Sequence, residues 1–181
     1  MIAKGYKNTE IGVIPEDWEV VNIVDVSTMK ARIGWQGLTV SEYQENGDYY
    51  LITGTDFYNG KVNWNTCHFV TKDRYEQDAN IQIKQGDILI TKDGTIGKIA
   101  FVDFLPLAST LNSGVFVIRP KKDDYSSLFM YYVFNSVYFD TFLNKLTAGS
   151  TIIHLYQKDF VKFNFPLPPK PEQLAIATAL S

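Results

Sequence analysis

The stretch GDILITKDGTIGK, residues 86–98, ends in the pair Gly97-Lys98 after a run of strand-like residues, which is how a phosphate-binding loop begins. A nucleotide-binding loop of this kind requires Gly, four further residues, Gly-Lys and then Ser or Thr, because backbone amides surround the phosphates and the hydroxyl binds magnesium. Here the first position is Lys92 and the last is Ile99. Both ends of the motif fail, and the following KIAFV favours a strand where the motif requires a helix.

A β-hairpin is the alternative interpretation of this stretch. ILIT and IGKIAFV are predicted as paired strands, with residues 92–95 at the tip and Asp-Gly as the tight-turn pair. Lys92 and Lys98 on such a projecting element are placed to meet phosphate oxygens, and a two-stranded ribbon fits the major groove of DNA. An ordinary hairpin in solvent gives the same pattern, so the pattern alone does not separate the two.

Residues suited to catalysis or metal binding form no recognisable set. The sequence contains no nucleophile elbow, no histidine-containing metal motif and no Gly-rich dinucleotide fingerprint. Cys67 is the single cysteine, and the neighbouring His68 has only the distant His154 as an imidazole partner. Asp56 in TGTDFY is a candidate base, although an Asp after a strand is more often a turn former. We predict no catalytic residue and no metal site.

Length and charge limit the class of protein. A chain of 181 residues predicts one globular unit with at most a short appendage. The net charge of −3 argues against a protein that binds a polyanion with its whole surface, but basic residues outnumber acidic ones between Lys84 and Lys122, which leaves room for a local basic patch. No apolar run is long enough for a membrane span and no signal peptide is apparent, so we expect a cytoplasmic protein.

The pattern of apolar residues predicts a mixed architecture rich in strands. We expect strands at residues 49–53, 61–64 and 87–91 and in IGKIAFV and GVFVIRP, with Asn59-Gly60 as a hairpin turn. A helix is expected from a Ser126 cap to about Leu146, before Gly149. The sequence between residues 31 and 47 predicts a long loop with a short helix at 41–44, and Trp18 is predicted to be a buried anchor.

The C-terminal sequence predicts a helix that is cut short. The prolines of PLPPKPEQ forbid a helix within that stretch but suit the entry to one, and PEQLAIATALS is rich in helix-forming residues. The helix reaches Ser181 without a Gly, Asn or basic cap. We therefore expect either a fragment or a module whose last helix normally continues.

Four ordered blocks resemble a known family. TEIGVIPEDWEVVNIVDV, GDILITKDGTIGKIAFV, LNSGVFVIRP and AGSTIIHLYQKDFVKFNFPLPPKPEQLAIATAL follow the order typical of the specificity subunit of type I restriction-modification systems. The resemblance implies an α+β fold: a β-rich target recognition domain with a few helices at residues 1–165, then a Pro-rich junction and the beginning of a long conserved spacer helix at 166–181. A full subunit of that family has two such domains and two helices, so this chain resembles half of one.

The function implied by the resemblance is sequence-specific DNA recognition without catalysis. In that family each recognition domain reads one half of a split target in double-stranded DNA, while separate modification subunits methylate adenine and a restriction subunit cleaves. Methyl donor and ATP then belong to the partners, and the chain itself needs no cofactor. Self-dimerisation through the C-terminal helix is a further implied contact. The alternative is a shortened specificity protein that acts mainly as a docking or dimerisation scaffold for the modification subunit.

The candidate DNA-binding residues fall into four groups. The loop ARIGWQG comes first, because Arg and Gln side chains pair bidentately with guanine and adenine, a Trp packs on sugar or an exposed base, and glycines allow close approach. Trp35 as a packed lid over the sheet is the alternative interpretation of that loop. The full set of candidates is Arg32, Trp35 and Gln36; Tyr58, Asn59 and Lys61; Lys92, Thr95 and Lys98; and Ser150 with Thr151.

Overall fold

The chain leaves one structural unit after Thr28 and returns to it at Pro120, so that a second unit is inserted between two segments of the first. The computed structural model describes residues 2–147 and 154–181. Unit 1 takes its described residues from Met1–Thr28, Pro120–Thr151 and Tyr156–Ser181, and unit 2 takes them from Met29–Arg119 and Ile152–Leu155. The single globular unit expected from chain length is therefore wrong, because the inserted segment builds a core of its own.

The central strand of unit 2 is β9, formed by the apolar run Ile88–Thr91, all four residues of which are buried. It pairs antiparallel with β10 on one edge and with β12 on the other, as the continuous apolar runs predict for strands buried on both faces. The sheet has the order β4-β12-β9-β10-β7-β6. Its strands are β4 (Ser27–Lys30), β6 (Phe57–Tyr58), β7 (Lys61–Val62), β9, β10 (Ile99–Phe101) and β12 (Val115–Pro120).

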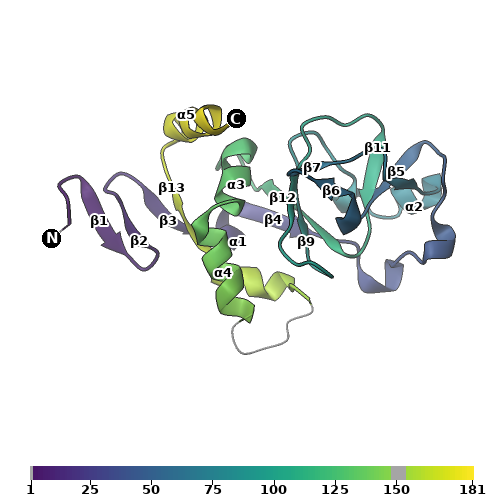
Figure 1. Cartoon of the computed structure of the whole chain (residues 1–181), viewed down its shortest axis with the longest axis horizontal. Coiled ribbons are helices and arrows are strands. Elements are labelled where there is room, and N and C mark those ends of the chain that lie inside the picture. Colours follow the sequence, from purple (N-terminus) through teal and green to yellow (C-terminus); the bar gives the residue numbers. More distant parts are fainter. Residues whose placement is uncertain (1, 148–153) are drawn as a thin grey trace. The chain divides into compact units, whose positions relative to one another are not determined.

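A second, smaller sheet shares the core of unit 2 (Figure 1). In it β5 pairs parallel with β11 and antiparallel with β8. Apolar side chains from both sheets form one buried cluster that includes Ile52 and Leu111 from the smaller sheet and Leu89 and Val117 from the larger. The remaining elements of unit 2 are β5 (Tyr49–Ile52), β8 (His68–Phe69), β11 (Ala108–Leu111), α2 (Lys72–Glu76), and the 3₁₀ turns η1 (Gly34–Gln36), η2 (Val40–Glu42), η3 (Gly54–Asp56) and η4 (Ala79–Ile81).

Unit 1 is built around an aromatic cluster. The Phe163 ring lies 5.1 Å from that of Phe142 and 5.3 Å from that of Phe139, between centroids, and Phe134 and Phe165 complete its surroundings. Two antiparallel strand pairs, β1-β2 and β3-β13, accompany the helices. The elements are β1 (Tyr6–Thr9), β2 (Gly12–Pro15), β3 (Glu19–Asn22), α1 (Ile23–Val26), α3 (Ser127–Phe134), α4 (Val137–Thr147), η5 (Gln157–Lys162), β13 (Asn164–Leu167) and α5 (Lys170–Leu180).

The predicted helix over residues 126–146 is two helices. Ser126 caps the first as expected, because its hydroxyl accepts from the Phe129 amide. The helix ends at Asn135, whose side chain and backbone N–H both donate to the Tyr131 carbonyl. Ser136 then accepts from the Tyr138 amide and starts α4. Short polar side chains that bond to nearby backbone compete with the helix, and this pair interrupts an otherwise apolar pattern. Gly149 lies outside the described residues.

The ends of the chain follow the sequence prediction more closely. Helix α5 begins at Lys170 with Pro171 in its first turn, where a missing N–H costs no intrahelical hydrogen bond. It packs on α3 within unit 1, and Gln173 accepts from the Ser126 amide. Trp18 is half-buried rather than fully buried, and its indole N–H donates to Glu172. No helix in the described residues combines the length and apolar character that a membrane crossing demands.

Candidate nucleic-acid interface

Three loops of unit 2 come together where β5, β9 and β11 end. The Asn112 amide donates to the Ile52 carbonyl at 2.9 Å, and the Lys92 amide donates to the Gly114 carbonyl at 2.9 Å. A Cβ at Gly54 would lie 2.8 Å from Cγ2 of Thr91, so the loop after β5 touches the end of β9. We call residues 53–56, 92–98 and 112–114 together the loop end. Parallel pairing of β5 with β11 and the central position of β9 bring these loops to one side of the unit (Figure 1).

The hairpin at the loop end explains the Gly97-Lys98 pair. The Thr91 hydroxyl donates to the Thr95 carbonyl at 2.5 Å and accepts from the Lys98 amide at 2.9 Å. Gly94 and Gly97 have φ values of +68° and +79°, in the left-handed region that favours glycine. The predicted antiparallel pairing of β9 with β10 is therefore confirmed, but the turn lies at Ile96 and Gly97 and not at the predicted Asp93-Gly94 pair. Thr95 and Lys98 are exposed.

The two tip lysines differ in their surroundings. Lys92 lies 3.5 Å from an Asp93 carboxylate oxygen and 5.8 Å from the centroid of the Phe116 ring, so its charge is engaged within the domain. Asp93 also contacts His154 Nδ1 at 2.6 Å. No carboxylate pairs with the Lys98 ammonium among the residues that the structure describes. Lys98 is accordingly the cation that this hairpin presents to an external anion.

The other loops of the loop end carry hydroxyl and amide groups. Thr53 and Thr55 share a hydrogen bond of 2.7 Å between their hydroxyls, and Thr55 is exposed. Asn112 accepts from the Ser113 hydroxyl and from the Gly114 amide through Oδ1. Asp56 is buried, and its carboxylate accepts from the Thr53 amide at 2.7 Å. The interpretation of Asp56 as a turn former is thus confirmed over that of a catalytic base.

Arg32 does not face solvent. It is 2% exposed, and its guanidinium donates to the Leu111 carbonyl at 2.8 Å, to Gln77 Oε1 at 3.0 Å and to the Thr110 hydroxyl at 3.1 Å. Burial lowers the pKa of the guanidinium, because desolvation disfavours the charged form. In this conformation the Arg32 side chain is not available to a base, because it anchors its loop to β11 and α2. Its contact with DNA stays a prediction.

In the rest of the ARIGWQG loop Trp35 is exposed, as a contact with DNA requires, whereas Gln36 is buried. Gln36 is 8% exposed, so its amide is not presented to an adenine in this conformation. Trp35 is 79% exposed, which contradicts the alternative of a packed lid over the sheet. Ile33 and Val40 are further apolar residues with exposed side chains. Because Arg32 bonds to the last residue of β11, the loop that carries Trp35 is anchored beside the loop end.

The Asn-Gly turn lies elsewhere on unit 2. Asn59 and Gly60 have φ values of +48° and +75°, which confirms the predicted tight turn. Lys61 follows this turn and is paired with Phe101 at the end of β10, which faces Ile88, the first residue of β9. The loop end begins at the other terminus of β9, roughly 10 Å away along the strand. The structure therefore does not bring the Tyr58, Asn59 and Lys61 group together with the hairpin tip, and Ser150 and Thr151 lie outside the described residues.

Comparison with known proteins decides the family. The model of the type I restriction modification DNA specificity domain matches residues 15–181. The chain belongs to this family. It is 32% identical over 98% of its length to the type I restriction enzyme MjaVIII specificity subunit of Methanocaldococcus jannaschii, and 26% identical over 93% to the EcoKI specificity subunit of Escherichia coli, covering 42% and 36% of those proteins. The specificity domain thus spans about two fifths of the curated relatives it matches.

Solved structures support the same fold. The HsdS subunit from Thermoanaerobacter tengcongensis superposes with a TM-score of 0.65 at 19% identity, over 99% of this chain and 40% of that one. The S subunit of the type I restriction-modification system from M. genitalium gives 0.62 at 15% identity, over 91% and 38%. The predicted α+β class, rich in strands with several helices and a C-terminal helix, is confirmed. The boundary predicted at residue 165 stays a prediction.

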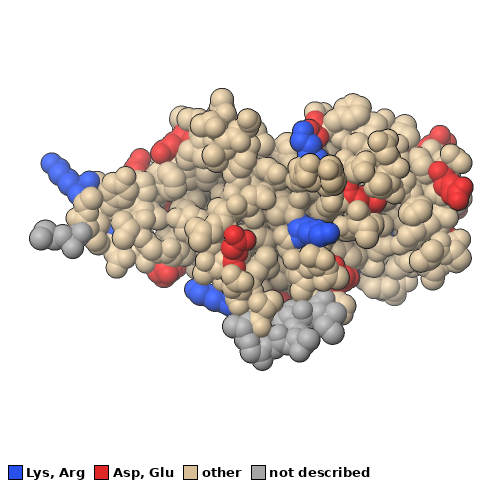
Figure 2. All heavy atoms as spheres, viewed as in Figure 1, with Lys and Arg blue, Asp and Glu red and all other residues tan. Residues whose placement is uncertain are grey.

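Basic residues of the specificity domain are distributed rather than massed. On the displayed face blue and red atoms are scattered among uncharged ones over the described residues (Figure 2). Arg119, from the basic stretch noted in the sequence, pairs with Asp87 at 2.6 Å and donates to the Asn80 and Gln82 carbonyls. Lys121 donates to the Val24 carbonyl at 2.5 Å. Much of the apparent basic patch is therefore structural. Among the described residues no cluster of metal ligands is found.

Sequence reasoning missed the polar side chains of the loop end that do not belong to the hairpin. Thr55, Asn112 and Ser113 each follow directly after a strand of the smaller sheet or the turn that ends it. A usable signal existed, because polar residues after successive parallel strands meet at one edge of a sheet. The parallel pairing of β5 with β11 was not apparent from the sequence, since 55 residues separate Ile52 from Ala108 and no helix of the usual crossover length connects them.

We expect Arg32→Ala to lower the free energy of unfolding by about 3 kcal/mol, because it leaves buried acceptors without donors. The measurement is urea denaturation followed by circular dichroism. Lys30→Ala, at a neighbouring exposed position, is the control and should change stability by about 0.5 kcal/mol or less. An Arg32→Ala protein of unchanged stability would show that the anchoring role is wrong.

Proposed function

We propose that this chain is a target recognition domain that reads one half of a split DNA target and directs partner modification and restriction subunits to it. Membership of the specificity domain family supports DNA as the ligand, and the share of the relatives that the chain spans supports one half-target as its extent. Methylation and cleavage then belong to the partner subunits, and the chain requires no cofactor. Residues 166–181 are the proposed junction and first turns of the spacer helix.

The loop end is the proposed DNA-facing surface. The observation that carries this assignment is the convergence of three strand ends, on whose loops Thr55, Thr95 and Lys98 are exposed. Lysine and threonine donate to phosphate oxygens, hydroxyls and amides also reach base edges, and a hairpin of this width enters a major groove. Lys92 also belongs to this proposed surface, although its ammonium already contacts the Asp93 carboxylate and the Phe116 ring.

Trp35 extends this surface with an apolar contact. A large aromatic side chain that is almost fully exposed, on a loop anchored by a buried Arg, is pre-organised for a partner. Against DNA it would pack on a sugar or an unstacked base. Gln36 joins the interface only if the loop rearranges. Ser150 and Thr151 remain proposed contacts, and the turn that carries Tyr58, Asn59 and Lys61 is a separate proposed contact at the opposite end of β9.

A second candidate function is scaffolding. Leu174 and Leu180 are exposed on α5, which favours docking of a modification subunit or self-dimerisation through that helix. Selection from a random duplex pool separates the two functions: the purified chain, with and without a modification subunit, should enrich one half-site sequence. The absence of any enriched sequence even with the modification subunit present would exclude direct recognition and leave the scaffold.

Lys98→Ala should weaken binding to every duplex alike and reduce the slope of log K against log salt by about 1, because one phosphate contact is lost. Lys61→Ala is the matched variant at the opposite end of β9, where the ammonium lies 2.5 Å from Asp103. Binding is measured by fluorescence anisotropy over a salt series. If Lys61→Ala flattened the salt dependence and Lys98→Ala did not, the Asn-Gly turn would be the DNA-facing end.

Trp35→Ala should reduce affinity for the selected duplex by about 1–3 kcal/mol, and Trp35→Phe should retain part of it, because a stacking or packing contact needs an aromatic face. Val40→Ala, an equally exposed apolar position in the same segment, is the control. Quenching of tryptophan fluorescence on addition of DNA, present in the unaltered chain and absent from the Trp35→Phe protein, reports the contact directly. Unchanged affinity of Trp35→Ala would remove this residue from the interface.

A further inference from the structure

Unit 1 contains an open groove along one face of α4. Tyr138, Thr141, Phe142, Lys145 and Leu146 line it at intervals of three and four residues, which is the spacing of one helical stripe. From Tyr138 to Leu146 the stripe is about 12 Å long. The groove has a volume of about 530 Å³. This face of α4 is therefore open to a ligand.

The opposite wall comes from the C-terminal part of unit 1. Lys162, Phe163 and Asn164 line it where η5 leads into β13, and Ile11 in the turn between β1 and β2 lies at one end. Phe163 belongs to the aromatic cluster of the unit, so the floor of the groove is the edge of the core. Elements that lie more than 120 residues apart in the sequence thus enclose one groove with an apolar floor.

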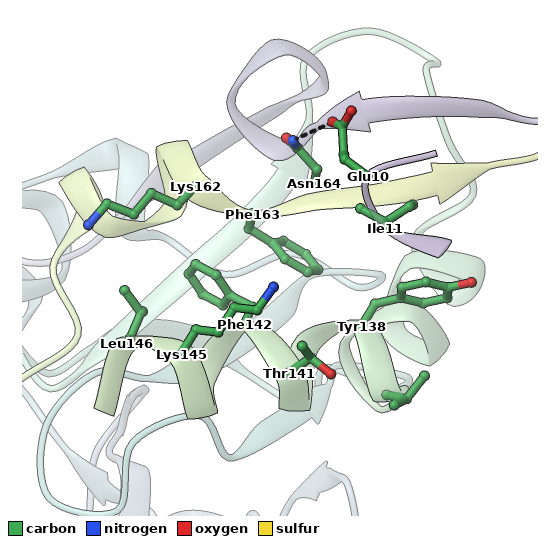
Figure 3. A pocket seen from close by; sticks show the side chains of 11 residues that line it. Glu10, Ile11, Tyr138, Thr141, Phe142, Lys145, Leu146, Lys162, Phe163 and Asn164 are labelled. Carbon is green, nitrogen blue, oxygen red and sulfur yellow. Dashed lines mark hydrogen bonds between the residues drawn. The ribbon is translucent and has the colours of Figure 1, made fainter. Parts of the chain in front are cut away.

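The groove carries charged side chains of both signs. Lys162 lies toward one end and Glu10 lies toward the other with Ile11, while the Lys145 side chain projects toward the middle, where Phe142 and Phe163 lie (Figure 3). Glu10 accepts from the Asn164 side-chain amide at 3.1 Å. No carboxylate pairs with the ammonium of Lys145 or Lys162 in the part of the chain that the structure describes. The groove therefore combines an apolar floor with two cations that no carboxylate of the described residues compensates.

We propose that this groove docks an acidic, amphipathic segment of a partner protein, with apolar side chains on the floor and carboxylates at the two lysines. The two lysines favour a partner segment with negative charge, and the aromatic floor favours a segment with an apolar face. The groove is also open at its edge, where Val137 lines it and is 68% exposed. A small molecule would be enclosed on most sides, whereas a chain segment covers such an open edge.

Duplex DNA fits this groove less well than an acidic protein segment. A phosphate backbone would meet Lys145 and Lys162, but it offers no apolar group for Phe142 and Phe163. Glu10 at the other end would repel it. A peptide satisfies both the lysines and the floor at once. The partner surface is accordingly distinct from the loop end, which belongs to unit 2.

The test uses two fluorescein-labelled peptides of about twelve residues that share the same helix-favouring, leucine-containing core and end in a run of either Glu or Lys. The full chain should bind the acidic peptide about ten-fold more tightly than the basic one. The double variant Lys145→Glu with Lys162→Glu should reverse that preference. Thr141→Arg, which fills the groove from an exposed position, should abolish binding of both peptides without unfolding the chain, as checked by circular dichroism.

Equal binding of the two peptides, or no binding of either, would overturn the proposal. Displacement of the acidic peptide by duplex DNA, with DNA binding lost in the Lys145→Glu and Lys162→Glu protein, would make the groove part of the nucleic-acid surface and also overturn it. The Lys98→Ala protein is the internal control, since it should bind the acidic peptide as the unaltered chain does. Failure of the docking groove and failure of DNA recognition at the loop end are thereby distinguished.

Discussion

Strand β9 is hydrogen-bonded on both edges and buried on both faces, and the geometry of unit 2 depends on this pairing. A change of register by one residue would move each side chain to the opposite face, where the close packing is formed around a different side chain. Thr91 at its end therefore holds a fixed position. From there its hydroxyl fixes the hairpin tip through Thr95 and Lys98, and its methyl group meets the loop at Gly54.

Two arginine side chains hold loops of unit 2 in place. Arg32 and Arg119 each use their guanidinium groups to satisfy backbone carbonyls, because a planar fork of donors can bridge loops that have no regular partner. Such residues stabilise the scaffold and contribute little positive potential at the surface. Lys98 and Lys145 have no carboxylate partner among the described residues, and each lies on a surface that we propose for an external partner.

Local pattern predicted the elements well where one interaction dominates. The Asn-Gly turn, the buried strands and the Ser126 cap depend on residues close in the sequence, and all are found. The Asp-Gly pair, by contrast, is not the turn of its hairpin. The helix predicted through residues 126–146 failed at Asn135 because polar side chains compete for the backbone within an apolar stretch. Side-chain orientation in the loop around Arg32 was not predictable, since its partners on β11 and α2 are more than 40 residues away.

By itself the sequence determined the family, the strand-rich α+β character and the positions of the tight turns, because ordered blocks of residues and turn chemistry are local properties of the chain. Only the tertiary structure decided which polar residues remain available to a ligand. Burial of Arg32, exposure of Trp35, the meeting of three strand ends and the groove along α4 all result from contacts between distant segments. The identity of a side chain states what it can bind, whereas its neighbours decide whether it does.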